Sequence, residues 1–91
     1  MASEETVEIV ENANIEIFPN PGHGTYTLRL NEIEGGAKAS IYSMTGQLIK
    51  QINIPIGTKE LPVYLNDAAE GIYLLRIESD TFVKELKVIK N

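Results

Sequence analysis

Hydrophobic and polar positions alternate along this chain in short runs, and the clearest run predicts a β-strand with one buried face. Within residues 25–30, Tyr26, Leu28 and Leu30 fall on one side and polar side chains fall on the other. A repeat of two residues is typical of a strand that covers a core with one face. We therefore expect this run to be half buried.

Several other segments have the length and composition of strands. They cover residues 6–10, 15–18, 37–43, 48–54, 59–64, 72–77 and 81–90. The short link with Gly46 between the third and fourth of these predicts a hairpin. Pro62 suits an edge strand, because proline cannot donate to a sheet ladder. Residues 72–77 carry apolar side chains on both faces, which favours a central strand.

These segments together predict the fold class. About seven short strands at spacings of roughly 8 to 12 residues indicate an all-β, immunoglobulin-like antiparallel β-sandwich. The one stretch with helix-forming composition, residues 65–71, covers barely a turn or two before Gly71, and we interpret it as a crossover connection. The segment that holds Asp67, Gly71 and Tyr73 resembles a tyrosine corner, in which a tyrosine hydroxyl bonds to backbone upstream.

Residues 19–24 read Pro-Asn-Pro-Gly-His-Gly, and we call this segment the proline corner. Proline fixes its own φ, lacks an N–H group and restricts the residue before it, so Asn20 is constrained from both sides. Gly22 and Gly24 supply the backbone freedom needed to turn into the following strand. We therefore expect a rigid corner with no reactive group.

Composition narrows the possible functions. The chain has 91 residues, 43% hydrophobic and 23% charged, which is typical of one globular domain. Its 13 acidic and 8 basic residues give a net charge of −5, which argues against binding to nucleic acid or to an anionic membrane surface. No apolar run approaches the roughly 20 residues of a spanning helix, and the start is acidic where an export signal is basic. We expect residues 1–14 to be a polar leader or linker with a possible first strand, and residues 15–91 to form the domain.

The residues that could carry chemistry are few, and we predict no catalytic, cofactor-binding or metal-binding site. The chain has no cysteine, so thiolate chemistry and disulfides are excluded. His23 lies between two glycines without a nucleophile beside it and is expected to be a solvated turn residue. Asn66, Asp67 and Glu70 could offer oxygen atoms to calcium but lack the ligand spacing of an EF-hand loop. We expect Asn66 or Asp67 to cap a turn instead.

The last predicted strand carries Lys84, Lys87 and Lys90. Residues three apart on a strand point to opposite faces, so these lysines do not form one stripe. We interpret them as positive charges that keep an edge strand soluble.

The order of these signals resembles a known family. The signals are residues 17–21 with Gly24, residues 39–42 with Thr45, Gly46 and Leu48, residues 65–71 with Tyr73, and a lysine-bearing strand at the end. In this order and spacing the chain resembles the C-terminal sorting domain of type IX secretion cargo, over residues 15–90.

This resemblance implies the tail of a larger secreted or surface protein of a Gram-negative bacterium. The cargo crosses the inner membrane first, so the domain passes through the periplasm. The folded tail is then recognised by the outer-membrane secretion machinery. By the resemblance, a sortase-like protease is expected to remove the tail by cutting before the domain, near or upstream of the acidic leader, and the cargo is then released or joined to surface lipopolysaccharide. Neither nucleic acid nor a small-molecule substrate is implied, and the domain is not expected to be an enzyme.

By the same resemblance, sorting information is expected in twelve residues. They are Pro19, Asn20, Pro21, Gly24, Gly46, Gly71, Tyr73, Lys84, Leu86, Lys87, Val88 and Lys90. We hypothesise that the last strand is an edge strand whose backbone groups and alternating side chains are offered to a receptor, as in β-strand addition.

One alternative from a different class remains. A generic immunoglobulin-like or fibronectin-like accessory module, associated with carbohydrate, would have the same strand pattern. Exposed aromatic side chains in one plane would favour it, and the chain holds only four tyrosines and two phenylalanines, most of which a core needs.

Overall fold

The computed structural model describes residues 14–31 and 36–91, and this part of the chain forms seven strands and no helix. The strands are β1 (Asn14–Phe18), β2 (Thr25–Asn31), β3 (Ala37–Ser43), β4 (Leu48–Ile54), β5 (Glu60–Tyr64), β6 (Gly71–Glu78) and β7 (Val83–Lys90). The further strand predicted at residues 6–10 lies outside the described residues. No helix in the described part could cross a membrane.

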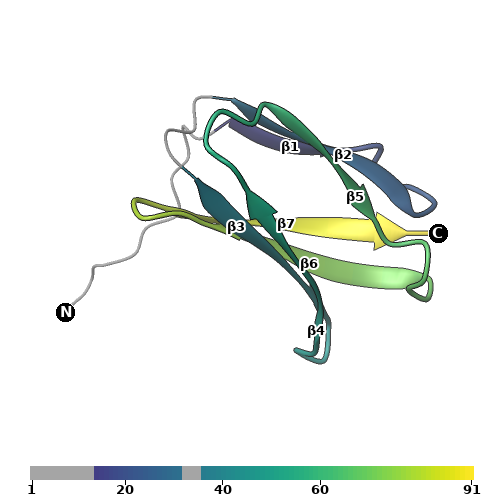
Figure 1. Cartoon of the computed structure of the whole chain (residues 1–91). Helices are drawn as coiled ribbons and strands as arrows, with labels where there is room; N and C mark the ends of the chain where they lie inside the picture. Colours follow the sequence, from purple (N-terminus) through teal and green to yellow (C-terminus); the bar gives the residue numbers. More distant parts are fainter. Residues whose placement is uncertain (1–13, 32–35) are drawn as a thin grey trace.

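The strands build two sheets that face each other (Figure 1). One sheet has the order β1-β2-β5 and the other β4-β3-β6-β7, and every neighbouring pair is antiparallel. The predicted all-β antiparallel sandwich is therefore confirmed. Because β6 lies between β3 and β7, the prediction of a central strand there is confirmed as well.

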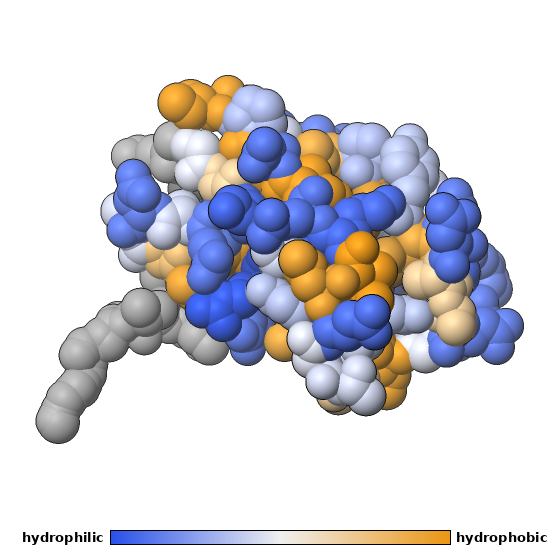
Figure 2. All heavy atoms as spheres, turned by 60° about the horizontal axis from the view of Figure 1, so that its bottom comes forward, coloured by the Kyte–Doolittle hydropathy of each residue, from blue (hydrophilic) through white to orange (hydrophobic). Residues whose placement is uncertain are grey.

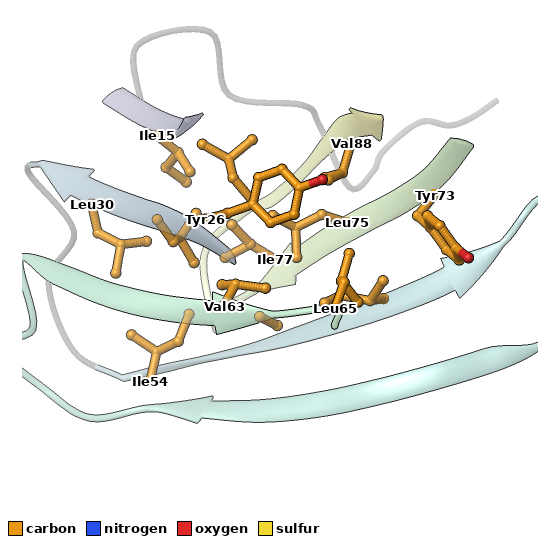
Figure 3. Close-up of a cluster of buried hydrophobic side chains, with 14 of the residues drawn as sticks. Ile15, Tyr26, Leu30, Ile54, Val63, Leu65, Tyr73, Leu75, Ile77 and Val88 are labelled. Carbon is orange, nitrogen blue, oxygen red and sulfur yellow. The ribbon is translucent and has the colours of Figure 1, made fainter. Parts of the chain in front are cut away.

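The hydrophobic core lies between the sheets and follows the alternation of the sequence. Tyr26, Leu28 and Leu30 of β2 are each at most 1% exposed, as predicted from their spacing. From the other sheet, Leu75 and Ile77 of β6 are fully buried against the same cluster (Figure 3). Burying one such side chain stabilises the fold by about 1.5–3 kcal/mol relative to leaving it exposed.

Local connections also follow the sequence. β3 and β4 form the predicted hairpin, and the N–H group of Ser43 donates to the carbonyl of Gln47 across its turn, where Gly46 has a φ of +92°. β5, which contains Pro62, is an edge strand as predicted.

Residues 65–70 carry the chain from β5 in one sheet to β6 in the other, which confirms the predicted crossover. The segment forms turns, and the N–H group of Ala68 donates to the carbonyl of Leu65. The Tyr73 hydroxyl donates to the carbonyl of Ala69, so the predicted tyrosine corner is present. The side chain of Asn66 was expected to cap this turn. Its Oδ1 atom instead lies 3.5 Å from the hydroxyl oxygen of Thr25 on β2.

The tyrosine corner generates a stability prediction. Tyr73→Phe keeps the ring, which is 7% exposed, and removes the bond to Ala69, so we expect the free energy of unfolding in urea to fall by about 1 kcal/mol. Tyr64→Phe is the matched control, because the Tyr64 side chain is 49% exposed, and its effect should stay within about 0.5 kcal/mol. Equal effects of the two changes would contradict a stabilising role for the corner.

Candidate recognition surface at the C-terminal strand

β7 is the last strand of the four-stranded sheet, so the prediction of a terminal edge strand is confirmed. It pairs with β6 over its whole length, without a bulge, from Val83 opposite Glu78 to Lys90 opposite Gly71. In such a ladder, alternate residues direct both backbone groups away from the neighbouring strand. Those outward groups define what the edge can offer to another molecule.

The amide of Asn20, in the proline corner, binds two of these outward groups. Its Nδ2 atom donates to the carbonyl of Lys87 at 2.7 Å, and its Oδ1 atom accepts the N–H of Ile89 at 2.9 Å. A side-chain amide carries one donor and one acceptor side, as a peptide group does. Asn20 therefore takes the place that a neighbouring strand would have along this part of β7.

The backbone of Gly22 continues the same pairing. Its N–H donates to the carbonyl of Ile89 at 2.9 Å, and its carbonyl accepts the N–H of Asn91 at 2.8 Å, which makes a parallel bridge opposite Lys90. A Cβ atom on Gly22 would lie 2.5 Å from Cε2 of Tyr26 and 2.7 Å from the carbonyl oxygen of Pro19. Glycine is required at position 22 because of this close approach.

Tyr26 reaches the same strand from inside the sandwich. Its side chain is 1% exposed and lies among the buried side chains of the core (Figure 3). Its hydroxyl donates to the carbonyl of Ile89 at 2.9 Å. Burial raises the pKa of this hydroxyl, so the phenol stays neutral. We call Asn20, Gly22 and Tyr26 together the C-terminal clamp.

The proline corner contributes Asn20 and Gly22 to this clamp and has further contacts of its own. The peptide bonds before Pro19 and Pro21 are both cis. Gly24 has a φ of +129°, and a Cβ atom there would lie 2.5 Å from Oδ1 of Asn66. Its carbonyl accepts the N–H of Leu65 at 2.6 Å. The corner is thus joined to the crossover loop as well as to β7.

Lys90 is tied to that same loop. Its Nζ atom donates to the carbonyls of Leu65 at 2.9 Å, Asn66 at 3.2 Å and Ala68 at 2.5 Å. The interpretation of the three lysines as charges that only keep an edge soluble is therefore wrong for Lys90, because its ammonium group is bonded within the fold. Lys87 is exposed and Lys84 is partly exposed.

The contacts of Lys90 also involve the loop that contains Asn66, Asp67 and Glu70, which were considered above as calcium ligands. The carbonyl oxygens of Leu65 and Ala68 in this loop accept hydrogen bonds from the Lys90 ammonium group. Among residues 14–31 and 36–91, no group of three or more histidine, cysteine, aspartate or glutamate side chains could hold a metal ion. His23 is exposed on the proline corner.

The two faces of β7 differ. Val88 is fully buried and Leu86 packs against the core on the inner face, which they share with Lys84 and Lys90. On the outer face, Glu85 lies 3.2 Å from the guanidinium of Arg76.

The rest of the outer face of this sheet combines apolar and polar side chains. Ile72 on β6 is 41% exposed and pairs with Ile89, and Leu48 on β4 is 47% exposed and pairs with Tyr42. Figure 2 shows that hydrophobic side chains on the displayed face of the molecule gather in small areas between hydrophilic ones.

Most of the residues expected to carry sorting information meet around the end of β7. The proline corner binds Lys87 and Ile89, while Gly71 and Tyr73 of β6 pair with Lys90 and Val88. Gly46 lies apart, in the β3–β4 turn, and Lys84 lies at the start of β7. The sequence predicted Gly22 and Tyr26 as a turn residue and a core residue and missed their bonds to β7. No periodicity could have indicated them.

The aromatic side chains do not form an exposed plane. All six lie in the described residues; Tyr26, Tyr73 and Phe82 are buried, Phe18 and Tyr42 are partly buried, and Tyr64 is exposed. Phe18 is covered by Arg29, whose guanidinium carbon lies 4.8 Å from the ring centre. The feature that would favour a carbohydrate-associated accessory module is therefore missing from these residues.

The fold places the chain in the class of small antiparallel β-sandwich modules. Comparison with known families identifies the particular family. The family described as secretion system C-terminal sorting domain matches residues 16–91, so the chain belongs to this family of type IX secretion tails. No curated protein matches the chain.

Membership in this family has direct consequences. The chain is a C-terminal sorting signal for type IX secretion, and its family is a sorting family rather than a catalytic one. Such a domain interacts with the type IX secretion machinery, follows a cargo domain, and belongs to a cargo that is secreted or displayed on the cell surface.

The clamp can be tested through Asn20. Asn20→Ala removes two hydrogen bonds to β7, and we expect the free energy of unfolding to fall by about 2 kcal/mol. Asn20→Asp keeps the acceptor but places a carboxylate against the carbonyl of Lys87, so it should be at least as destabilising at pH 7. At pH 3, where the carboxyl group is protonated and can donate, the Asp variant should recover part of this loss relative to wild type at the same pH. A loss for Asn20→Asp that does not change between pH 7 and pH 3 would contradict the proposed donor role.

The carbonyl contacts of Lys90 give a second prediction. Lys90→Met keeps most of the side-chain length and removes the ammonium group, so we expect a loss of about 2 kcal/mol in urea unfolding. Lys87→Met is the matched control on the same strand, because Lys87 is exposed, and its effect should be within about 0.5 kcal/mol. Similar values for the two variants would show that the three carbonyl contacts contribute little.

Proposed function

We propose that this domain is recognised at the outer membrane as a folded β-sandwich, and that the sorting signal is this folded state together with the exposed part of β7. A sortase-like protease then removes the domain by cutting upstream of it, after the cargo has passed through the periplasm. The domain itself performs no chemistry. Its partners are the outer-membrane secretion machinery and that protease.

One observation carries this proposal. The last five residues are held by groups far away in the sequence: Asn20 and Gly22 bind Lys87, Ile89 and Asn91. Separating this end from the domain as a linear peptide would break all of these bonds together. A receptor that reads the end of the chain therefore meets it as part of the sandwich.

In this proposal all the expected sorting residues except Gly46 divide into two groups. Most of them act indirectly, since they hold the fold around the end of β7: Pro19, Asn20, Pro21, Gly24, Gly71, Tyr73, Leu86, Val88 and Lys90. Lys84 and Lys87 are available to a partner. Gly46 fixes the β3–β4 turn, and nothing in its surroundings connects it with β7.

The proposed function is tested by export of a fusion. The whole 91-residue chain is placed behind an export signal and a reporter in a bacterium with a type IX system. We expect the reporter on the surface or in the medium of wild-type cells, and in the periplasm of cells that lack the secretion channel. Equal distribution in both strains would refute the proposal.

A variant of the proline corner separates indirect from direct recognition. Replacing Pro19 and Asn20 together by alanine should lower stability and export in parallel, because both residues act through the fold. Loss of export with unchanged urea unfolding would instead mean that the corner touches the receptor itself.

A further inference from the structure

The C-terminal clamp covers only one half of the outer edge of β7. Ile89 directs both backbone groups outward, since it bonds to Asn20 and Gly22, and Lys87 directs its carbonyl to Asn20. By the alternation of an antiparallel ladder, Glu85 and Val83 also point outward. Among the described residues, no strand other than β6 pairs with β7 at these positions.

The open stretch therefore has a definite composition. It consists of the N–H and carbonyl groups of Val83 and Glu85 and the N–H group of Lys87. It ends at the clamp, because the next outward group, the Lys87 carbonyl, is 2.7 Å from Nδ2 of Asn20. An added strand could form up to five backbone hydrogen bonds here and would have to stop or turn away at the proline corner.

Two of the other sheet edges, β5 and β4, are less open to such pairing. β5 carries Pro62, which has no N–H to donate. β4 has a register shift opposite Ile41 and Tyr42, and its Lys50 side chain crosses to the carbonyl of Tyr64 on the other sheet at 2.6 Å. Bulges and prolines are devices that keep edges from pairing. The first half of β7 has a regular ladder and no proline.

We propose that the outer edge from Val83 to Lys87 is the site where an extended, acidic strand of the secretion receptor adds to the four-stranded sheet. This inference rests on the proposed function, since it names the contact by which the folded tail is read. Backbone bonds would supply the affinity, and side chains on alternate sides would supply the specificity.

The charges on this edge favour an acidic partner. Lys84 and Lys87 lie within the site, one on each face, and Glu85 shares the guanidinium of Arg76 with Glu78. The stretch from Val83 to Lys87 thus carries two positive charges and one negative charge, on a chain with a net charge of −5. Acidic side chains opposite the two lysines would form favourable cross-strand pairs.

A second copy of this chain fits the edge less well. Antiparallel self-pairing centred on this stretch would place Glu85 directly opposite the Glu85 of the other copy, and like charges opposite each other are destabilising. Two chains of the same net charge also repel each other. The structure therefore favours a different protein as the occupant.

The test compares two substitutions at one position, in the full-length fusion described above. Glu85→Pro removes the outward N–H and leaves the ladder to β6 intact, because that N–H points away from β6 and proline is accepted on edge strands. Glu85→Ala removes the same side chain and the same ion pair with Arg76 but keeps the N–H. We expect Glu85→Ala to be exported within about twofold of wild type and Glu85→Pro to be exported roughly tenfold less, the change that about 1.4 kcal/mol produces.

A second pair of variants keeps the test valid if Glu85→Pro does not fold. Val83→Pro changes the first residue of β7, where proline is best tolerated, and Val83→Ala is its control. Urea unfolding of the purified domains identifies any variant that does not fold, and the comparison is made on the folded pair. If a folded proline variant is exported as well as its alanine control, strand addition at this edge is refuted while the sorting function stands. If wild type itself does not depend on the secretion channel, the proposed function fails instead.

Amide hydrogen exchange of the isolated protein provides an independent check. The amide of Ile89 should be protected by Asn20, whereas those of Val83, Glu85 and Lys87 should exchange rapidly because their edge is open. Slow exchange of Glu85 at every protein concentration would mean that another segment of this chain, such as residues 6–10, already occupies the edge. Protection that appears only with rising concentration would assign the edge to a second copy. Either result overturns the proposal.

Discussion

The pairing of the last residues with a corner 67 residues earlier in the chain is the constraint on which the rest of this structure depends. Asn20 supplies a donor and an acceptor to β7, and the Gly22 backbone continues that pairing as far as Asn91. Each of these bonds contributes only about 1 kcal/mol. Together they hold the end of the chain as a strand of the sandwich and not as a free tail. They also decide which part of the edge stays open.

Two further contacts make the arrangement cooperative. The ammonium group of Lys90 binds carbonyls of the crossover loop, and Gly24 of the proline corner accepts the N–H of Leu65 in that same loop. The proline corner, the crossover loop and the end of β7 therefore support one another. A change in any of the three is felt by the other two, because they share partners. In the proposed function, a receptor that reads the end of β7 would therefore read a folded domain.

The same geometry separates residues whose polar groups are bonded within the fold from residues whose groups face outward. Asn20, Tyr26 and Lys90 direct their polar groups into the fold, where a partner could reach them only by breaking existing bonds. Lys87 and the edge around Glu85 face outward. A sequence pattern does not distinguish the residues bonded within the fold from the residues that face outward. It gives the type of residue at each position but not the contacts that the residue makes.

The sequence by itself determined the all-β class, the strand positions, the β3–β4 hairpin, the central β6, the terminal edge strand and the tyrosine corner. It could do so because each follows from local alternation, turn residues or spacing within a few positions of the chain. Only the tertiary structure decided that Asn20 pairs with Lys87 and Ile89 and that Lys90 binds the crossover loop. Alternation predicts the face on which a side chain lies but not its partner. Partners that lie 22 to 69 residues apart in the sequence are set by how the two sheets pack.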